Sequence, residues 1–334
     1  MAATLALAGD TMLGRGVGEA LRADPAAALI APEVAQHIAR ADAFVLNLEC
    51  CISERGTPFP DPGKPFYFRA PPVAAERLAE IGVDAVTLAN NHALDYGPEA
   101  LLDTIAHLHA AGILAVGAGA NEALARRPQV LPCGELRLRL VGFSDHPRAY
   151  AAAGERPGIA FADLAAGLPA WARASVRPGA DADAVLVTPH WGPNMVAQPT
   201  APIRRAADAL LAAGATLVAG HSAHVFHGVA SRVLFDLGDF IDDYAVQPEL
   251  RNDLGLLWLV DLDCGTPTRV RALPLALDYC FTRSAAPAEA DWIARRLSEL
   301  CAPFRTVVEV LGNGLIELHA EQVVECPAEN ATPS

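Results

Sequence analysis

The chain has 334 residues, of which 52% are hydrophobic and 19% are charged. This composition excludes a disordered protein, and the length excludes a mini-domain held together by disulfides. The 25 basic and 39 acidic residues give a formal net charge of −14, which repels phosphate backbones, so we expect no nucleic-acid partner. We expect one domain over residues 1–319 and a flexible tail over residues 320–334.

The cysteines and the apolar runs indicate the cellular setting. Seven scattered cysteines include no C-x-x-C pair, which favours buried free thiols over a zinc knuckle or a redox pair. The first ten residues lack the basic segment of a signal peptide, and no apolar run reaches the roughly 20 residues that a membrane span needs. We therefore predict a cytoplasmic protein that does not associate with a membrane.

Short apolar runs alternate with amphipathic helical patterns over the first two thirds of the chain. The expected strands are residues 4–8, 43–48, 84–88, 113–116, 138–143, 184–188 and 216–219. Helices are expected at residues 72–81, 98–111 and 202–213, because each pattern opens with proline and is followed by glycine. This alternation indicates a largely parallel sheet that is covered on both faces.

The pattern changes after Gly228. Strands are expected at residues 233–237, 256–261 and 270–277 with no helix between them, which favours antiparallel pairing. The proline-rich residues 57–72 predict a long surface loop, while residues 288–300 predict a final helix and residues 307–318 a hairpin. The predicted fold class is therefore α/β, with a mostly parallel sheet followed by an antiparallel C-terminal portion.

Side chains that ligate metals or move protons follow five of the expected strands, each within a few residues of the strand end. They are Asp10, Glu49, Asn91, His92, His190, His221 and His224. Because the carboxyl ends of parallel strands meet at one edge of a sheet, we expect these side chains to lie in one crevice.

The donor types suggest the chemistry of that crevice. Carboxylate and amide oxygens mixed with imidazoles suit zinc, manganese or iron, and a set of this size can hold two ions. Two ions about 3.5 to 4 Å apart need a bridging carboxylate and can activate water for hydrolysis. Each residue alone also has a structural explanation: Asp10 could cap a helix, and Asn91 could belong to a turn.

One motif also allows a different enzyme class. G-H-S-A-H at residues 220–224 is close to the serine-hydrolase pattern G-x-S-x-G, with Ser222 as the nucleophile. However, His224 replaces the last glycine, and the following residues do not begin an amphipathic helix. We therefore favour the metal site over a serine nucleophile.

Seven short motifs resemble those of one known family. They are G-D-T-M-L-G-R (9–15), N-L-E (47–49), K-P-F-Y-F-R-A-P-P (64–72), A-N-N-H-A-L-D-Y-G (89–97), H-W-G-P-N (190–194), G-H-S-A-H (220–224) and G-D-F-I-D-D-Y (238–244). In this order they resemble the bacterial capsule-synthesis family of the CapA, poly-γ-glutamate type. The resemblance implies the layered sandwich and the dinuclear site of calcineurin-like metallophosphoesterases.

The resemblance also implies a role for each of the strand-end residues. Asp10, Glu49 and His224 would hold one ion, and Glu49, as the bridge, would hold the second with Asn91, His190 and His221. His92 would be the general acid or base, which suits an imidazole that titrates near neutral pH. The metallophosphoesterase pattern has D-x-H at its first strand, whereas this chain has Asp10-Thr11-Met12. The first site would therefore lack the histidine that this pattern supplies from the first strand.

Further residues are candidates for contacts around the ions. Arg69, Lys64 and Arg15 could bind anionic groups of a substrate, since guanidinium and ammonium groups pair with carboxylate or phosphate. Asp239 could hydrogen-bond to a histidine ligand.

The hypothesis that we favour is a metal-dependent hydrolase with two divalent ions. Its substrate would be a small molecule or a peptide, either a phosphoester or an amide related to poly-γ-glutamate. The same groups could instead abstract and return an α-proton, as in a peptide epimerase. A non-catalytic scaffold for polymer synthesis is the alternative from another class.

Overall fold

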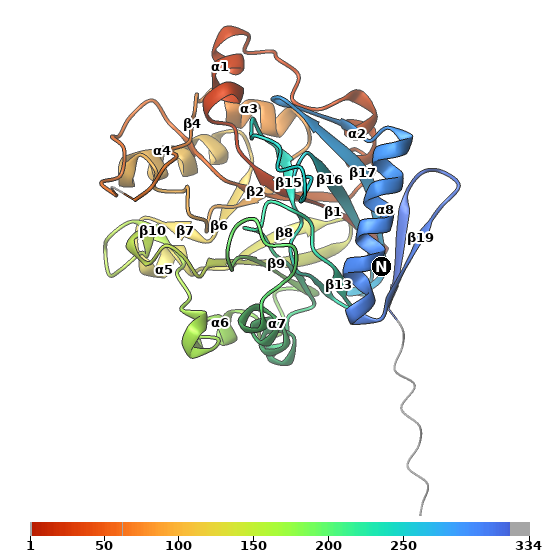
Figure 1. Cartoon of the computed structure of the whole chain (residues 1–334). Coiled ribbons are helices and arrows are strands. Elements are labelled where there is room, and N and C mark those ends of the chain that lie inside the picture. Colours follow the sequence, from red (N-terminus) through yellow and green to blue (C-terminus); the bar gives the residue numbers. More distant parts are fainter. Residues whose placement is uncertain (1, 62, 321–334) are drawn as a thin grey trace, which may run out of the picture.

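The computed structural model describes residues 2–61 and 63–320 (Figure 1). Within these residues, two large sheets are stacked and helices cover their outer faces. Figure 1 shows α1 and α3 on one side of the molecule and α6 and α7 on the opposite side, with the strands between them. The expected α/β class, with parallel strands followed by an antiparallel portion, is confirmed.

The larger sheet joins the first and last parts of the chain. Its strand order is β19 (Thr306–Val310), β20 (Ile316–Ala320), β17 (Thr266–Asp278), β16 (Leu254–Asp263), β1 (Ala2–Thr11), β2 (Ala43–Leu48), β5 (Ala85–Thr87) and β6 (Leu114–Val116). β15 (Asp239–Ile241) also pairs with β1, and β18 (Phe281–Ser284) pairs with β17. The pairs from β1 to β6 are parallel, and those from β1 to β19 are antiparallel.

The second sheet is built from the middle of the chain. Its order is β13 (Val229–Ala230), β14 (Val233–Leu234), β12 (Leu217–Ala219), β11 (Ala184–His190), β9 (Leu136–Ser144) and β8 (Gln129–Cys133). The pairs from β9 to β14 are parallel. Two small sheets pair β3 (Cys51–Ile52) with β4 (Arg69–Ala70), and β7 (Ala118–Gly119) with β10 (Gly158–Ile159).

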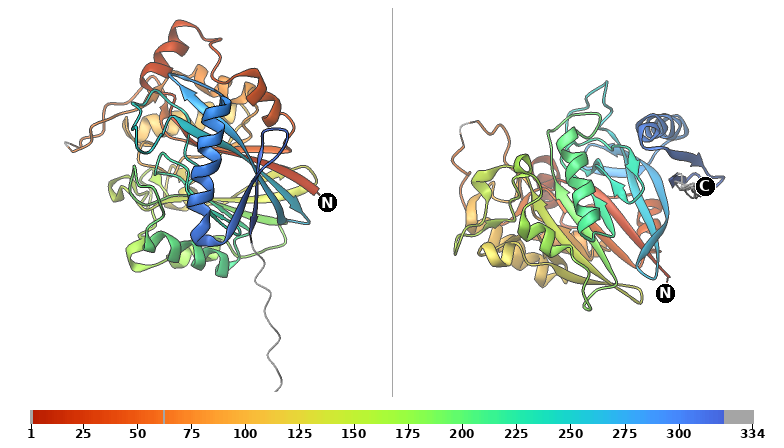
Figure 2. Two further views of the ribbon diagram at one scale, coloured as in Figure 1. Left: turned by 45° about the vertical axis from the view of Figure 1, so that its right-hand side comes forward. Right: turned by 90° about the horizontal axis from the view of Figure 1, so that it is seen from below.

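Helices connect the strands and pack on the outer faces. They are α1 (Arg15–Ala23), α2 (Pro32–Ile38), α3 (Val73–Glu80), α4 (Gly97–Ala110), α5 (Glu122–Ala125), α6 (Ala170–Ser175), α7 (Ala201–Ala213) and α8 (Pro287–Cys301). Short 3₁₀ turns occur at η1 (Arg148–Tyr150), η2 (Leu164–Ala166) and η3 (Ala302–Phe304). α8 packs on β16 and β17, and Figure 2 shows it lying across these strands. No helix in the described residues is long and apolar enough to cross a membrane.

The alternation of side chains along each strand divides the core into layers. On β1, Leu5 and Leu7 belong to a cluster that fills the space between the sheets, whereas Ala6 and Ala8 belong to a cluster under the helices. On β11, Leu186 faces the first of these clusters, and Val187 belongs to a third one beneath α6 and α7. Strands with two buried faces read as continuous apolar runs, which is the pattern in the sequence.

Most of the expected elements form within one to three residues of their expected ends, but two expectations change. The strand expected at 233–237 stops after Leu234, because Leu237 forms a bridge with Phe226 instead. The expected tail, 320–334, lies outside the described residues except for Ala320, which is the last residue of β20. The hairpin partner β8 and the helices α1 and α2 were not expected.

Candidate metal centre

The candidate ligands lie where parallel strands of both sheets end. Asp10 pairs in register with Asn47 on β2 and with Asp239 on β15. On the other sheet, His190 is the last residue of β11 and forms a bridge with His221, which follows β12. The two stacked sheets therefore bring their carboxyl ends to one place.

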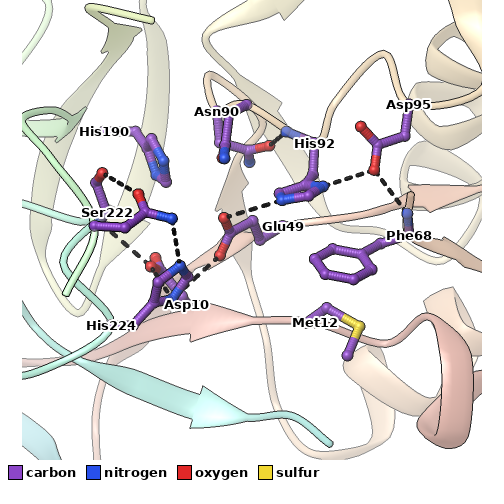
Figure 3. A network of polar contacts seen from close by, with 12 residues as sticks. Asp10, Met12, Glu49, Phe68, Asn90, His92, Asp95, His190, Ser222 and His224 are labelled. Carbon is purple, nitrogen blue, oxygen red and sulfur yellow. Dashed lines mark hydrogen bonds and ion pairs between the residues drawn. The ribbon is translucent and has the colours of Figure 1, made fainter. Parts of the chain in front are cut away.

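Asp10 is the central residue of this cluster (Figure 3). Its carboxylate lies 3.3 Å from His221 Nδ1 and 3.4 Å from His224 Nδ1, and it accepts a hydrogen bond of 2.8 Å from Asn47 Nδ2. Burial alone would raise the pKa of Asp10, but His221, His190 and His224 together lower it below its usual value. Asp10 is therefore a carboxylate held in its charged form.

Glu49 is fully buried, and neither of its carboxylate oxygens has a hydrogen-bond partner. His92 Nε2 lies 3.9 Å from one of these oxygens, and His224 Nδ1 lies 4.0 Å from the other. Burial, and then the charge of Asp10, raise the pKa of Glu49 well above its usual value. An ionised Glu49 therefore requires a positive charge at this position.

Other buried donors in the same place also lack partners. Asn91 Oδ1, His190 Nε2 and Asp239 Oδ2 are buried without a hydrogen bond, and so is His221 Nδ1, although Asp10 lies near it. Buried polar atoms in folded proteins are otherwise nearly always paired, so several orphaned atoms at one place need a common explanation. Their chemistry, oxygen and imidazole nitrogen without thiolate, fits transition-metal ions.

Two groups of side chains have ligand atoms that lie within 4.8 Å of one another. One consists of Asp10, Glu49 and His190, and the other of Asp10, His224 and Asp239. Asp10 belongs to both groups, whereas the family resemblance implies Glu49 as the shared residue. Asp239 Oδ1 lies 2.8 Å from His224 Nδ1, as expected for a residue that orients this imidazole, and its other oxygen is unpartnered.

His92 borders the cluster and is held by a carboxylate (Figure 3). Its Nδ1 lies 2.6 Å from Asp95 Oδ2, so Nε2 is left facing Glu49. Asp95 also accepts hydrogen bonds from Phe68 N at 2.6 Å and from Tyr150 Oη at 3.0 Å. Burial lowers the pKa of His92 to about 4, although the bond to Asp95 opposes this shift.

A cavity of about 600 Å³ opens on the cluster, and His92 and His224 are among the residues that line it. Arg15, one of the three expected contacts of substrate anions, also lines this cavity. Its guanidinium, however, is paired with Asp243.

Lys64 and Arg69, the other two expected contacts of substrate anions, are not among the lining residues. Lys64 Nζ lies 3.0 Å from Asp95 Oδ1 and donates to the backbone oxygen of Asn91 at 2.7 Å. Arg69 donates to the backbone oxygen of Arg55 and lies over the ring of Tyr96. Both cations therefore have partners within the protein, and Lys64 supports the segment that carries His92.

The serine-hydrolase alternative has no support from the contacts of Ser222. Its hydroxyl donates to the backbone oxygen of Gly192 at 3.0 Å, and its backbone N–H donates to Asp10 Oδ2 at 3.3 Å. The chain continues into the short strand β13 and not into a helix. The nucleophile geometry of that class needs a strand followed directly by a helix.

The sequence reasoning missed three residues that support the cluster. Asn47 bonds to Asp10, and its Oδ1 accepts a hydrogen bond of 2.9 Å from Asn90, which in turn accepts from His92 N at 3.0 Å. Asp95 was missed because it lies on a turn and not at a strand end. Its position three residues after His92 is the signal that could have indicated a carboxylate partner.

Met12 occupies the place where the metallophosphoesterase pattern has a histidine. It is fully buried, and Figure 3 shows it beside Phe68. The thioether contributes to the core here. Of the three residues that the resemblance assigns to the first ion, His224 is therefore the one imidazole.

Comparisons with known proteins identify relatives of this chain. The model of the family described as bacterial capsule synthesis protein PGA_cap matches residues 4–244. A probable polyglutamine synthesis accessory protein of Mycobacterium tuberculosis is 32% identical over 314 residues, which cover 87% of this chain and 79% of that protein. The capsule biosynthesis protein CapA of Bacillus anthracis is 27% identical, covering 72% of this chain and 60% of that protein.

The fold is also that of a solved structure. The crystal structure of a novel phosphatase from Mycoplasma pneumoniae superposes with a TM-score of 0.52 over 87% of this chain and 97% of that one, at 13% sequence identity. At this identity the match shows the fold alone. The family match covers far more than half of the sequence and includes every strand end that carries a candidate ligand. The chain therefore belongs to the bacterial capsule synthesis protein PGA_cap family.

Proposed function

We propose that this protein is a metal-dependent hydrolase with a dinuclear centre, which acts on a phosphoester or on a peptide-like amide related to poly-γ-glutamate. The observation that carries the proposal is the set of orphaned buried donors on Glu49, Asn91, His190 and His221 around the carboxylate of Asp10. Hydrolysis is favoured because the cluster opens on a cavity that is large enough for a small-molecule substrate.

The residues of the cluster would hold two divalent ions, manganese, zinc or iron. Asp10, Glu49 and His224 would be ligands of one ion, and Glu49, Asn91, His190 and His221 of the other, with Asp239 orienting His224 or joining the ligands. When bound, such ions supply Lewis-acid polarisation of the scissile group and a water of lowered pKa.

The protein itself supplies the proton transfer. Hydrolysis joins the oxygen of water to phosphorus or to the carbonyl carbon, and breaks the bond to the leaving oxygen or nitrogen. The leaving atom departs with the electron pair of that bond and needs one proton. His92 is the candidate for this transfer, because Asp95 binds its Nδ1 and leaves Nε2 toward the cavity. Nε2 would accept the proton that the attacking water loses and pass it to the leaving atom.

Element analysis of the purified protein tests the first part of this proposal. We expect close to two equivalents of transition metal in the wild type and less than one in Glu49→Gln. His109→Gln, which changes an exposed histidine on α4, is the matched control and should keep the wild-type content. The wild type can also be dialysed against micromolar Mn²⁺ or Zn²⁺. Uptake of less than about 0.1 equivalent of metal would contradict the proposal and favour a scaffold.

Activity assays on the metal-loaded protein test the second part. Release of p-nitrophenol from bis(p-nitrophenyl) phosphate would support phosphoester hydrolysis, and new amino groups from γ-glutamyl peptides would support amide hydrolysis. Exchange of α-hydrogen for deuterium without bond cleavage would instead show an epimerase and overturn hydrolysis. We also propose a cytoplasmic location, supported by the buried free thiols of Cys50, Cys51 and Cys133.

A further inference from the structure

Aromatic rings line part of the cavity beside the candidate metal centre, together with polar residues that include Asn194 and Asn252. Phe68 stacks on His92 with ring centroids 4.1 Å apart, and Phe66 stacks on Phe68 at 6.3 Å. Tyr244 closes another side, 5.9 Å from Phe68 and 5.4 Å from His224. A group in this cavity therefore touches ring faces while the rest of the substrate reaches the two histidines.

The apolar surface continues to the mouth of the cavity. Phe66 is 53% exposed and Met195 is 36% exposed, and both line the cavity. Exposed apolar side chains that line a cavity are typical of a ligand-binding groove. Their position at the mouth favours a ligand with an apolar portion.

The charge of the cavity is cancelled within the protein. Arg15 Nε lies 3.0 Å and 3.2 Å from the two carboxylate oxygens of Asp243, which also accepts a hydrogen bond of 2.9 Å from Gly16 N. The Arg15 guanidinium lies 5.0 to 5.4 Å from the centroids of Phe66, Phe68 and Tyr244. Among the lining residues that the structure describes, Arg15 is the only guanidinium or ammonium group.

Away from the ions that the proposed function requires, an anionic group in this cavity would meet a cation that is already paired with Asp243. The Tyr244 hydroxyl can donate only one hydrogen bond. A neutral ring or a branched aliphatic group would instead contact the aromatic rings on several sides, and no charge would have to be desolvated.

We infer that the substrate places a neutral aromatic or branched aliphatic group in this cavity, directly beside the scissile bond, and that free carboxylates are excluded from it. This inference rests on the proposed hydrolase function, and it narrows the substrate class. The chain would then act on an apolar ester or amide and not within a run of free γ-linked glutamates.

Three p-nitrophenyl phosphonate esters test the inference on the metal-loaded protein. They share the leaving group and differ in the group on phosphorus, which is phenyl, methyl or carboxymethyl. We expect kcat/KM to be about tenfold or more higher for phenyl than for methyl, and lowest for carboxymethyl. Phe66→Ala should bring the phenyl-to-methyl ratio close to one, and the exposed Val310→Ala on β19 should leave the ratio unchanged.

Asp243→Asn tests the exclusion of carboxylates from the cavity. It removes the partner charge of Arg15, so the carboxymethyl-to-methyl ratio should rise about tenfold. A phenyl-to-methyl ratio of one in the wild type, or one that Phe66→Ala leaves intact, overturns the inference.

If none of the esters is hydrolysed, the phosphoester branch of the proposed function fails, and calorimetric binding of the monomethyl esters of phenyl- and methylphosphonate still decides the inference. Tighter binding of the phenyl compound, lost in Phe66→Ala, supports it, and equal binding overturns it.

Discussion

At the scale of single residues, the predictable part of the candidate site was the set of polar side chains at strand ends. Asp10, His190 and His221 each follow an apolar run, and this placement alone predicts a shared crevice. The partners of Lys64 and Arg69 were not predictable, because the contacts with Asp95 and Tyr96 depend on how a proline-rich loop folds back. The sequence of a motif does not show whether a basic side chain is available to a substrate or is paired within the protein.

Asp95 is a positioning residue for His92, and its replacement tests the proton-transfer role. Asp95→Asn keeps the shape but removes the negative charge that faces His92. It also puts an amide NH2 in place of either Oδ2, which accepts from Phe68 N and contacts His92 Nδ1, or Oδ1, which contacts Lys64 Nζ. We expect kcat to fall about 10²- to 10⁴-fold with KM nearly unchanged. Tyr150→Phe removes another bond to Asp95 and leaves His92 bound, so it is the matched control. Equal kcat values in the two variants would remove His92–Asp95 from the mechanism.

His227 makes stability depend on pH. Burial lowers its pKa to about 4, and its Nε2 donates to the backbone oxygen of Val196 at 2.8 Å. The unfolded chain takes up a proton near pH 6.5, which the folded protein resists until about pH 4, so stability is complete above pH 6.5 and falls as the pH decreases. We expect this site to cost about 2 kcal/mol between pH 7.5 and pH 5. Urea unfolding of His227→Gln should show a smaller loss, and an identical loss would refute the assignment.

At the scale of elements, sequence periodicity predicted the parallel strands and their helices well. It could not show that β9, β11 and β12 form a second sheet, because an apolar run with two buried faces has the same pattern in one sheet as in two. The pairing of β15 with β1 was also hidden, since β15 has three residues and joins a strand more than 200 positions earlier. This pairing is what places Asp239 beside Asp10.

Gly9 permits that pairing, and its replacement tests it. A Cβ on Gly9 would lie 1.7 Å from the backbone oxygen of Gly238, a group that cannot move aside because it accepts from Asp10 N at 2.9 Å. We expect Gly9→Ala to lower the free energy of unfolding by about 3 kcal/mol or more, and to reduce metal uptake. Gly312→Ala, where nothing lies within 4 Å, is the control and should change stability by less than about 0.5 kcal/mol. Normal metal uptake by a folded Gly9→Ala protein would show that the Asp10–Asp239 register does not matter for the site.

At the scale of the whole molecule, buried carboxylates of both sheets and their loops gather at one place. They are Asp10, Glu49, Asp95, Asp236, Asp239 and Asp242. Burial raises the pKa of Asp236 and of Asp239 well above the usual value, which reflects how poorly the uncompensated site holds negative charge. Because the cluster joins β1 and β2 of one sheet to β11 and β12 of the other, cations bound here would hold the two sheets together.

The stability of the whole protein should therefore respond to metal. We expect saturation with Mn²⁺ or Zn²⁺ at about 100 times the Kd to add about 2.7 kcal/mol to the free energy of unfolding, and to raise the Tm by several degrees. Glu49→Gln replaces a buried carboxylate that lacks hydrogen-bond partners by a neutral amide of the same shape. Stripped of metal, this variant should be at least as stable as the stripped wild type, because it buries no charge there. It should gain little when metal is added, because it lacks a ligand. Thermal unfolding of both proteins, with and without metal, is the measurement. If Glu49→Gln simply damaged the fold, the variant would have a lower Tm than the wild type under both conditions.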